Sequence, residues 1–215
     1  MPLIWPLSLS GQSFKVTGTV KDGSNDAIPF ANVFLLKLAD STIVKGASAD
    51  ENGTFSIENV LPDVYYIRAS YIGKTSNFIS LDIKENVRIG AIIINQNVER
   101  LEEVVVISSQ PTIEKKSDRM IFHVENTLVS QGSTWDVLKK TPGVVVVQDQ
   151  LYIRNQSPTV YLNDRKTQLS PNEIRDLLQG ISGINIKSIE VIPNPPARYE
   201  SEDGPILNII TSNSI

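Results

Sequence analysis

The first half of the chain is a series of short β segments separated by turn-forming residues, and this pattern restricts the fold more than any other feature. Between Phe14 and Asn97, runs such as FKVTGTV and TFSIENV alternate apolar and polar residues, and Gly, Asn and Asp fill the gaps. No segment in this range keeps the period of an amphipathic helix. The pair Asn52-Gly53 lies between two such runs and predicts a β-hairpin turn. About seven strands at this spacing predict an antiparallel β-sandwich.

The second half of the chain mixes helical and strand signals. Ser133 is expected to cap a short helix that continues to Lys140 and is ended by a Thr-Pro-Gly turn. Ser170 followed by Pro171 and Glu173 is typical of a helix start, with a cap, a proline in the first position and a glutamate that returns to the cap. Short strands are expected over Val144–Val147, Leu151–Arg154, Thr159–Leu162, Ile186–Ile192 and Pro205–Thr211. This pattern predicts a small α+β unit.

Composition excludes several classes of protein. The chain has 215 residues, of which 40% are hydrophobic and 20% are charged, which is typical of one large or two small globular domains. The formal charge of −4 comes without long blocks of either sign, so no nucleic-acid partner is expected. The absence of cysteine excludes disulfides, thiolate zinc sites and a cysteine nucleophile. No apolar run reaches 18 residues, so no transmembrane helix is predicted.

Two segments lie outside these units. The first thirteen residues, MPLIWPLSLSGQS, are apolar and then small, which predicts the remnant of a secretory signal; the alternative is a disordered or strand-adding tail. The stretch Val98–Gln110 joins the two halves and contains the β-branched run Val104–Ile107. Such a run is typical either of a buried strand or of a strand edge that pairs with a partner.

The residue types that usually carry chemistry are sparse. The turn Asp22–Asp26 offers oxygen ligands at a spacing that could hold Ca²⁺, but a solvated Asx-type turn is the favoured interpretation. His123 is the only histidine and is expected to pair with Glu125 on a strand surface, while Trp135 is expected in the core. No paired carboxylates, activated nucleophile or phosphate loop appears in a recognisable context. The sequence therefore predicts a protein that is not an enzyme and holds no cofactor or metal.

Motifs in the first half resemble a known domain. They are V-T-G-T-V (16–20), I-P-F-A-N-V (28–33), A-D-E-N-G-T-F-S-I (49–57) and L-P-D-V-Y (61–65). Together they resemble the carboxypeptidase-regulatory-like sandwich, of transthyretin type, that precedes the plug in outer-membrane receptors of the Bacteroidetes type.

Motifs in the second half are similar to the plug domain of TonB-dependent receptors. They are V-L-K-K-T-P-G-V (137–144), Y-L-N-D-R-K (161–166), I-K-S-I-E-V-I-P-N-P (186–195), A-R-Y-E (197–200) and G-P-I-L-N-I-I (204–210). The resemblance departs from the family where Leu162–Lys166 replaces an I-D-G-K type turn and where the final turn reads E-D-G-P. These departures affect local turn geometry. The two resemblances together imply four parts of the chain: a signal remnant or tail at 1–13, a seven-stranded sandwich at 14–97, a linker at 98–115 and a plug at 116–215.

The resemblance also implies a function. The chain would be the N-terminal extension and plug of an outer-membrane receptor, gating energy-coupled uptake of a nutrient through a β-barrel that these residues do not contain, so the chain is expected to be a piece of a longer receptor. It would face the periplasm and the barrel lumen. Its implied partners are a TonB-type periplasmic energy transducer, the outer-membrane β-barrel of the same full-length chain, and a surface lipoprotein. The substrate stays open among small molecules, glycans and peptides.

The resemblance assigns roles to two sets of residues. The candidate Ton box, which the energy transducer would capture by strand addition, is Leu101, Glu102, Glu103, Val104, Val105, Val106 and Ile107. The loops expected to face substrate are Gln148, Asp149, Gln150, Asn155, Gln156 and Ser157. Arg198–Glu200 is expected to anchor the plug against the barrel wall. The alternative function is a stand-alone periplasmic or cell-surface binding or adhesion module that recognises a glycan or a protein.

Overall fold

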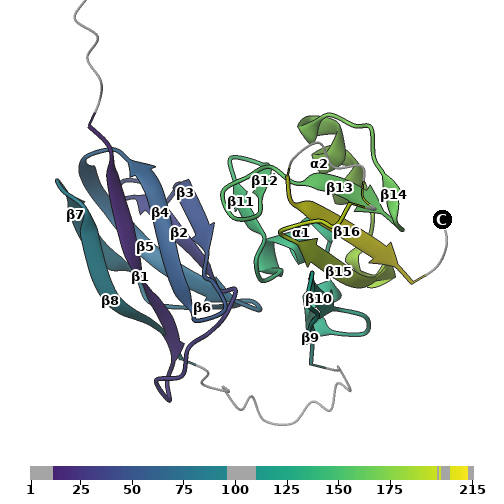
Figure 1. The fold of residues 1–215 in the computed structure, drawn as a ribbon, viewed down its shortest axis with the longest axis horizontal. Coiled ribbons are helices and arrows are strands. Elements are labelled where there is room, and N and C mark those ends of the chain that lie inside the picture. The colour runs from purple at the N-terminus through teal and green to yellow at the C-terminus, as the bar shows by residue number, and fades with distance from the viewer. Residues whose placement is uncertain (1–11, 96–109, 198, 200–203, 213–215) are drawn as a thin grey trace, which may run out of the picture.

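The structure is a computed structural model that describes residues 12–95, 110–197, 199 and 204–212. It contains a β-sandwich and an α+β unit, each built around its own hydrophobic core (Figure 1). The predicted fold class, a β-sandwich followed by a small α+β part, is therefore confirmed.

The sandwich consists of two sheets. One sheet has the strand order β4-β1-β8, and the other has the order β3-β2-β5, with β6 and β7 both pairing with β5. All pairs are antiparallel except β1 with β8, which is parallel because β8 returns from the opposite sheet. The strands are β1 (Phe14–Asp22), β2 (Asn32–Lys37), β3 (Ile43–Ser48), β4 (Thr54–Val60), β5 (Asp63–Tyr71), β6 (Lys74–Thr75), β7 (Ile79–Ile83) and β8 (Val87–Ile94).

Alternation along the strands fills the sandwich core. In β1, Val16, Gly18 and Val20 are buried, while Thr17 and Thr19 between them are half-buried. Strand β2 differs, because its residues Asn32–Leu36 are all buried. Val33 and Leu35 point into the sandwich core, so the residues between them must be covered from outside. The consecutive apolar letters VFLL therefore mark a strand that is buried on both faces.

The turn at Asn52-Gly53 exists, but the predicted hairpin is wrong. Strand β3 pairs with β2 and β4 pairs with β1, so the turn carries the chain from one sheet to the other. The Asp50 carboxylate accepts hydrogen bonds from the backbone N–H groups of Asn52 and Thr54, each 2.8 Å long, which closes the turn. Gly53 has φ of +73°, and a Cβ there would lie 2.8 Å from the carbonyl oxygen of Val20. The glycine therefore serves a close approach to β1 as well as a turn.

The α+β unit is built on a six-stranded sheet with the order β14-β13-β16-β15-β10-β9 and carries a separate hairpin, β11-β12. Within the sheet β13 and β16 are parallel and the other pairs are antiparallel. The strands are β9 (Thr112–Lys115), β10 (Met120–His123), β11 (Val145–Val147), β12 (Gln150–Tyr152), β13 (Thr159–Leu162), β14 (Arg165–Lys166), β15 (Ile186–Ile192) and β16 (Ile206–Thr211).

Two α-helices and two 3₁₀ turns complete this unit. Helix α1 (Thr134–Lys140) and helix α2 (Pro171–Gly180) begin at Ser133 and Ser170, and both have capping boxes, which confirms the predicted helix starts. The 3₁₀ turns are η1 (Leu128–Ser130) and η2 (Gly183–Asn185). Trp135, Val137 and Leu138 of α1 and Leu178 of α2 are buried in the same core cluster as the central strands.

A buried asparagine joins the two units. Asn32 of β2 is 2% exposed, and its side-chain Nδ2 donates to the carbonyl oxygens of Thr141 at 3.1 Å and Val144 at 2.8 Å. Nearby, the backbone N–H of Gly143 donates to the carbonyl oxygen of Phe30 at 2.9 Å. The Thr-Pro-Gly turn that ends α1 is therefore held against the sandwich by hydrogen bonds from both the backbone and a side chain.

Apolar contacts surround this polar link. Phe34 and Leu36, on the outer face of β2, are buried with Val145 of the β11-β12 hairpin in a small separate core. Figure 1 shows this hairpin on the side of the α+β unit that faces the sandwich. Gly46 of β3 makes the close approach possible, since a Cβ at this position would lie 2.5 Å from Cγ1 of Val145.

We predict that Gly46→Ala weakens the contact between the units, whereas Gly90→Ala does not. A Cβ at residue 90 meets no atom within 4 Å, although both glycines lie in sandwich strands. Overpacking at residue 46 should cost about 1–3 kcal/mol. Amide hydrogen exchange of β11 and β12 measures the effect directly. Equal exchange of the hairpin in both variants would contradict a role for Gly46 in docking.

Candidate functional site

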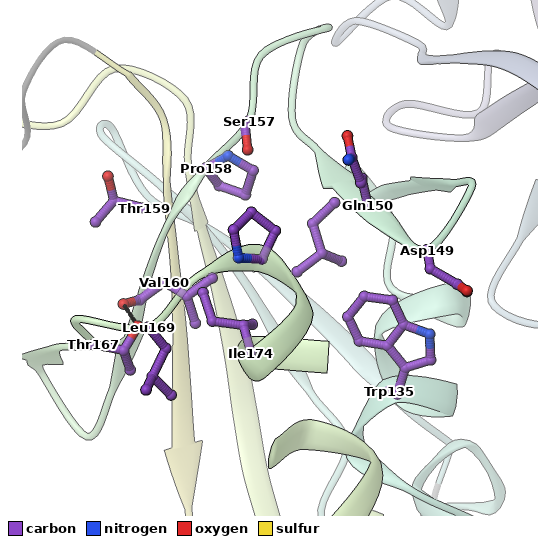
Figure 2. Close-up of a pocket in the computed structure, with 12 residues that line it drawn as sticks. Trp135, Asp149, Gln150, Ser157, Pro158, Thr159, Val160, Thr167, Leu169 and Ile174 are labelled. Atoms are coloured by element: carbon purple, nitrogen blue, oxygen red, sulfur yellow. Dashed lines mark hydrogen bonds between the residues drawn. The ribbon is translucent and has the colours of Figure 1, made fainter. Parts of the chain in front are cut away.

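A cavity of about 220 Å³ opens in the α+β unit between the β11-β12 hairpin, strand β13 and the start of α2 (Figure 2). Its apolar wall includes Trp135, Leu151, Val160 and Ile174. Polar groups lie on the two loops that flank it, at residues 149–150 and 157–159. A pocket that combines an apolar wall with a few polar groups is the usual form of a ligand site. Its volume suits one small group of a ligand, such as a single sugar ring or a side chain.

Helix α1 fixes the tryptophan wall of the cavity. The Ser133 hydroxyl accepts from the backbone N–H of Asp136 at 3.2 Å, and Asp136 Oδ2 accepts from the backbone N–H and the hydroxyl of Ser133 at 3.2 and 2.8 Å. The hydrogen bond from this hydroxyl, followed by the one from the backbone, lowers the pKa of Asp136. Trp135, which directly precedes Asp136 in the helix, is 2% exposed. Within the described residues its Nε1 has no hydrogen-bond partner.

Helix α2 forms the opposite wall. Ser170 caps it, with Pro171 in the first turn, and Glu173 Oε2 accepts from the Ser170 backbone N–H at 2.8 Å and hydroxyl at 2.6 Å. These bonds lower the pKa of Glu173, the serine hydroxyl contributing most. Pro171 and Ile174 of α2 line the cavity, and Figure 2 shows Ile174 on the helix beside it.

An ion-pair cluster ties the hairpin to α2 at the edge of the cavity. Arg175 Nη1 lies 3.1 Å from Asp149 Oδ2, and its Nη2 lies 2.9 Å from Asp176 Oδ1. These carboxylates, Asp176 first, raise the pKa of Arg175. Gln148 and Asp149 both have positive φ, of 48° and 59°, as a two-residue hairpin turn of type I′ requires. The turn geometry therefore places the Asp149 carboxylate where Arg175 can hold it.

The predicted loop residues divide between two cavities. Asp149, Gln150 and Ser157 line the cavity that contains Trp135. Gln148 and Asn155 line a second, larger cavity of about 460 Å³, which lies between the hairpin and strands β3 and β4 of the sandwich. Gln156 lines neither, and its backbone forms a tight bridge with Ile153 through hydrogen bonds of 3.0 and 2.9 Å. Their predicted role toward a substrate remains a prediction.

Trp135 has a more direct place at the site than the sequence indicated. It is a core residue, as expected, and it also forms a wall of the cavity. In Figure 2 the six-membered ring of the indole lies on the cavity side and its nitrogen on the far side. The sequence does indicate where Trp135 lies in its helix, because the Ser133 cap places it near the start of α1. No local pattern connects that position with the loops of the cavity, which are more than ten residues away.

Three other predicted features turn out as follows. The candidate Ton box Leu101–Ile107 lies outside the described residues. In the turn at residues 22–26, Asp22 Oδ1 accepts from the backbone N–H groups of Ser24 and Asp26 at 2.9 and 3.0 Å, which is an Asx-type turn.

His123 Nε2 lies 3.2 Å from Glu114 Oε2 on the neighbouring strand β9, so the expected pairing with Glu125 is wrong. That contact with His123 is the largest cause lowering the pKa of Glu114.

A half-buried polar network under Tyr199 was not predicted from the sequence. Arg119, whose side chain is 9% exposed, pairs with Glu190 Oε2 at 2.7 Å and Asp118 Oδ2 at 2.8 Å and donates to the Tyr199 hydroxyl at 3.0 Å. The Asp118 contact contributes most to raising the pKa of Arg119. Buried Asn208 donates to Glu190 at 3.2 Å and to Asp164 at 2.8 Å. Tyr199, expected to anchor the unit to a barrel, thus makes contacts inside the unit.

The described residues contain no group of three or more His, Cys, Asp or Glu side chains arranged to hold a metal ion. In the same part of the chain, no helix has the length and apolar character needed to cross a membrane.

Comparison with known proteins identifies the first unit. Residues 16–106 match the family model of the CarboxypepD_reg-like domain, so the chain contains such a domain. The match covers the sandwich and continues through most of the candidate Ton box. None of the curated proteins compared with the chain matches it.

Solved structures show only a distant likeness. BcpA, the major pilin subunit of Bacillus cereus, is 16% identical with a TM-score of 0.34, over 40% of this chain and 30% of that one. A DUF3823 family protein from Parabacteroides merdae is 10% identical with a TM-score of 0.32, over 55% of this chain and 61% of that one. The chain therefore spans less than two thirds of either structure.

We predict that Asp136→Asn lowers stability at neutral pH by about 0.5 kcal/mol, because the first turn of α1 loses a negative charge near the helix N-terminus. The pKa of Asp136 is lowered from its ordinary value of 3.8 in the folded chain. Its contribution is therefore present above that ordinary value and is lost as pH falls through the lowered pKa of the folded state. Urea unfolding at several pH values should show the variant and the parent chain converging in acid. Glu125→Gln, an exposed charge change, serves as the control, and a difference that persists unchanged in acid would contradict the assignment.

Proposed function

We propose that the chain is a non-catalytic binding part of the bacterial cell envelope. The observation that carries this proposal is the convergence of two polar loops, through Asp149, Gln150 and Ser157, on a cavity walled by Trp135. The CarboxypepD_reg-like domain is docked against the same unit and offers a second interaction surface, which supports the proposal of a binding role. The site combines an apolar wall with an amide, a hydroxyl and the Asp149 carboxylate, which is paired with Arg175, and this composition suits recognition of a small polar organic group.

In its finer form, we propose that the second unit is the plug of a TonB-dependent outer-membrane receptor and that the sandwich is its periplasmic extension. The motifs that resemble the plug family lie together in one unit. Residues 137–144 form the end of α1 and its closing turn, and residues 161–166, 186–192 and 206–210 form strands β13–β14, β15 and β16, which are neighbours in one sheet. Because the motifs together build one folded unit, they are expected to occur together in one family, which supports the interpretation of the motifs as a family signature.

The sheet order suggests how a pull on the linker would act. Strand β9 (Thr112–Lys115) follows the linker and lies at the edge of the sheet, where β10 is its one partner among the described strands. Three of its four residues are exposed. Force applied to the candidate Ton box would therefore reach β9 first, and an edge strand held on one side by four residue pairs separates more easily than a strand paired on both sides. Such local opening would gate the barrel without unfolding the core.

A stand-alone binding or adhesion module is the second candidate. The docked arrangement favours it, since Asn32 and Phe34 of the sandwich are buried against the α+β unit. The family match ends at residue 106 and does not reach the α+β unit, so the plug assignment depends on the resemblance of the motifs alone. The two candidates differ in what Leu101–Ile107 does.

The first test changes the candidate Ton box within the full-length gene product. Deleting Glu102–Val106 should abolish energy-coupled uptake and leave barrel assembly intact. Val105→Pro should have the same effect, because proline removes a backbone N–H needed for strand addition, whereas Val105→Ala should retain uptake. Uptake is measured with outer-membrane levels as control. Equal uptake by the proline and alanine variants would exclude the receptor form.

The second test uses hydrogen exchange on the purified chain. In the receptor form, the amides of Leu101–Ile107 should exchange as fast as an unstructured segment because they wait for a partner. In the stand-alone form they should be protected as a paired strand. The amides of Ile67 and Ala69, in the central strand β5, provide the protected reference. Protection of Leu101–Ile107 equal to that reference would favour the stand-alone module.

A further inference from the structure

The outer face of one sandwich sheet is only partly covered by the α+β unit. On this face, Phe34 and Leu36 of β2 lie opposite Arg68 and Tyr66 of β5. Phe34 and Leu36 are buried beneath the β11-β12 hairpin. Tyr66 and Arg68 of β5 lie next to this contact and are only half-buried. Phe78, just before β7, lies beyond them, and 45% of its surface is exposed. Tyr66, Arg68 and Phe78 are called the platform below.

The platform holds a cation in a fixed orientation. Cζ of Arg68 lies 4.7 Å from the centre of the Phe78 ring, so the guanidinium stacks on that ring. The rings of Tyr66 and Phe78 are 5.4 Å apart and tilted by 44°. This packing restrains a side chain that would otherwise be flexible, and the entropy cost of fixing it is met before any ligand arrives.

The guanidinium of Arg68 is partly buried, like those of Arg119 and Arg175, but unlike them it has no acidic partner among the described residues. Arg119 and Arg175 each pair with two carboxylates. Across the described ranges, Arg68 forms no hydrogen bond or ion pair, and its Nε is buried without an acceptor. Asp82, the acid on this face of β7, is already paired with Lys84 at 2.6 Å. A positive charge with free donors therefore lies against the ring of Phe78.

We propose that the platform binds an acidic saccharide, with a sugar carboxylate on Arg68 and the sugar ring against Phe78 and Tyr66. A planar guanidinium matches a carboxylate through two parallel hydrogen bonds, and stacking fixes the plane in which they form. The exposed aromatic surface accepts the apolar face of a sugar ring. The Tyr66 hydroxyl and the Ser80 side chain, which lies opposite Tyr66 in the sheet, add groups for the ring hydroxyls. This site deepens the proposed binding function by naming a ligand class for the sandwich.

A saccharide fits this surface better than an acidic peptide does. The recognising groups lie on the face of the sheet, whereas a peptide that adds as a strand uses the backbone at a sheet edge. The cation is single and its surroundings are aromatic, which suits one carboxylate per sugar ring rather than a run of acidic side chains. The peptide is therefore kept as an alternative outcome of the test.

The test is calorimetric titration of the chain with trigalacturonate, with neutral maltotriose and triglutamate as comparison ligands. Trigalacturonate should bind and maltotriose should not. Arg68→Lys keeps the charge but loses the planar fork, so it should weaken binding about tenfold or more. Phe78→Ala should weaken it similarly by freeing the guanidinium. Arg88→Lys, at an exposed position on β8, is the matched control and should leave the affinity unchanged.

A measurement on the parent chain makes the test independent of variant stability. Trigalacturonate should shift the NMR resonance of the Arg68 Nε–H, which is buried and unpaired in the free chain. Absence of binding, equal affinity of the residue-68 and residue-88 variants, or triglutamate bound as tightly as trigalacturonate would each overturn the proposal. The uptake difference between the two Val105 variants does not involve this face, so failure of the platform and failure of the receptor proposal are distinguishable.

Discussion

The relative placement of the two units depends on one buried amide. Asn32 donates both hydrogens of its side chain to carbonyl oxygens of the turn that ends α1, at Thr141 and Val144. Each such hydrogen bond contributes only about 1 kcal/mol to the stability of the fold. Leaving either buried carbonyl oxygen without a donor would cost about 1–3 kcal/mol of stability. The pairing therefore selects one docked arrangement more strongly than it stabilises the fold. Because α1 also carries Trp135, the same contact fixes the cavity wall relative to the sandwich.

Local order in the sequence anticipated most elements, and long-range contacts explain what it missed. The two capping boxes at Ser133 and Ser170 were readable because a cap and its returning acid lie three residues apart. The strand over Ile186–Ile192 was readable from its apolar run. The turn at Asn52-Gly53 was recognised, yet its strands belong to different sheets, since partner choice is decided by contacts with β1 and β2 rather than by the turn.

The candidate site was predictable only in part, for the same reason. The polar loops at residues 148–150 and 155–157 could be named, but their division between two cavities depends on where the hairpin docks. That docking needs a residue without a side chain at position 46, an amide at position 32 and Val145 in contact with both strands. Val145 is about a hundred residues from the other two positions in sequence, and no local pattern connects it with them. The resemblance to a plug named the unit but did not describe its contact with the sandwich.

One sheet face of the sandwich carries both the contact with the α+β unit and the platform, so the two are physically linked. Tyr66 packs with Phe34, Leu36 and Val145 in the contact between the units, and its ring also lies 5.4 Å from Phe78 on the exposed platform. A ligand that contacts Tyr66 on the platform therefore interacts with a side chain whose position depends on the docked hairpin. If the ligand prefers the docked form, binding must stabilise docking by the same free energy, because coupling between two sites is reciprocal. A separable sandwich would lose this coupling, and the buried Asn32 contact is what preserves it.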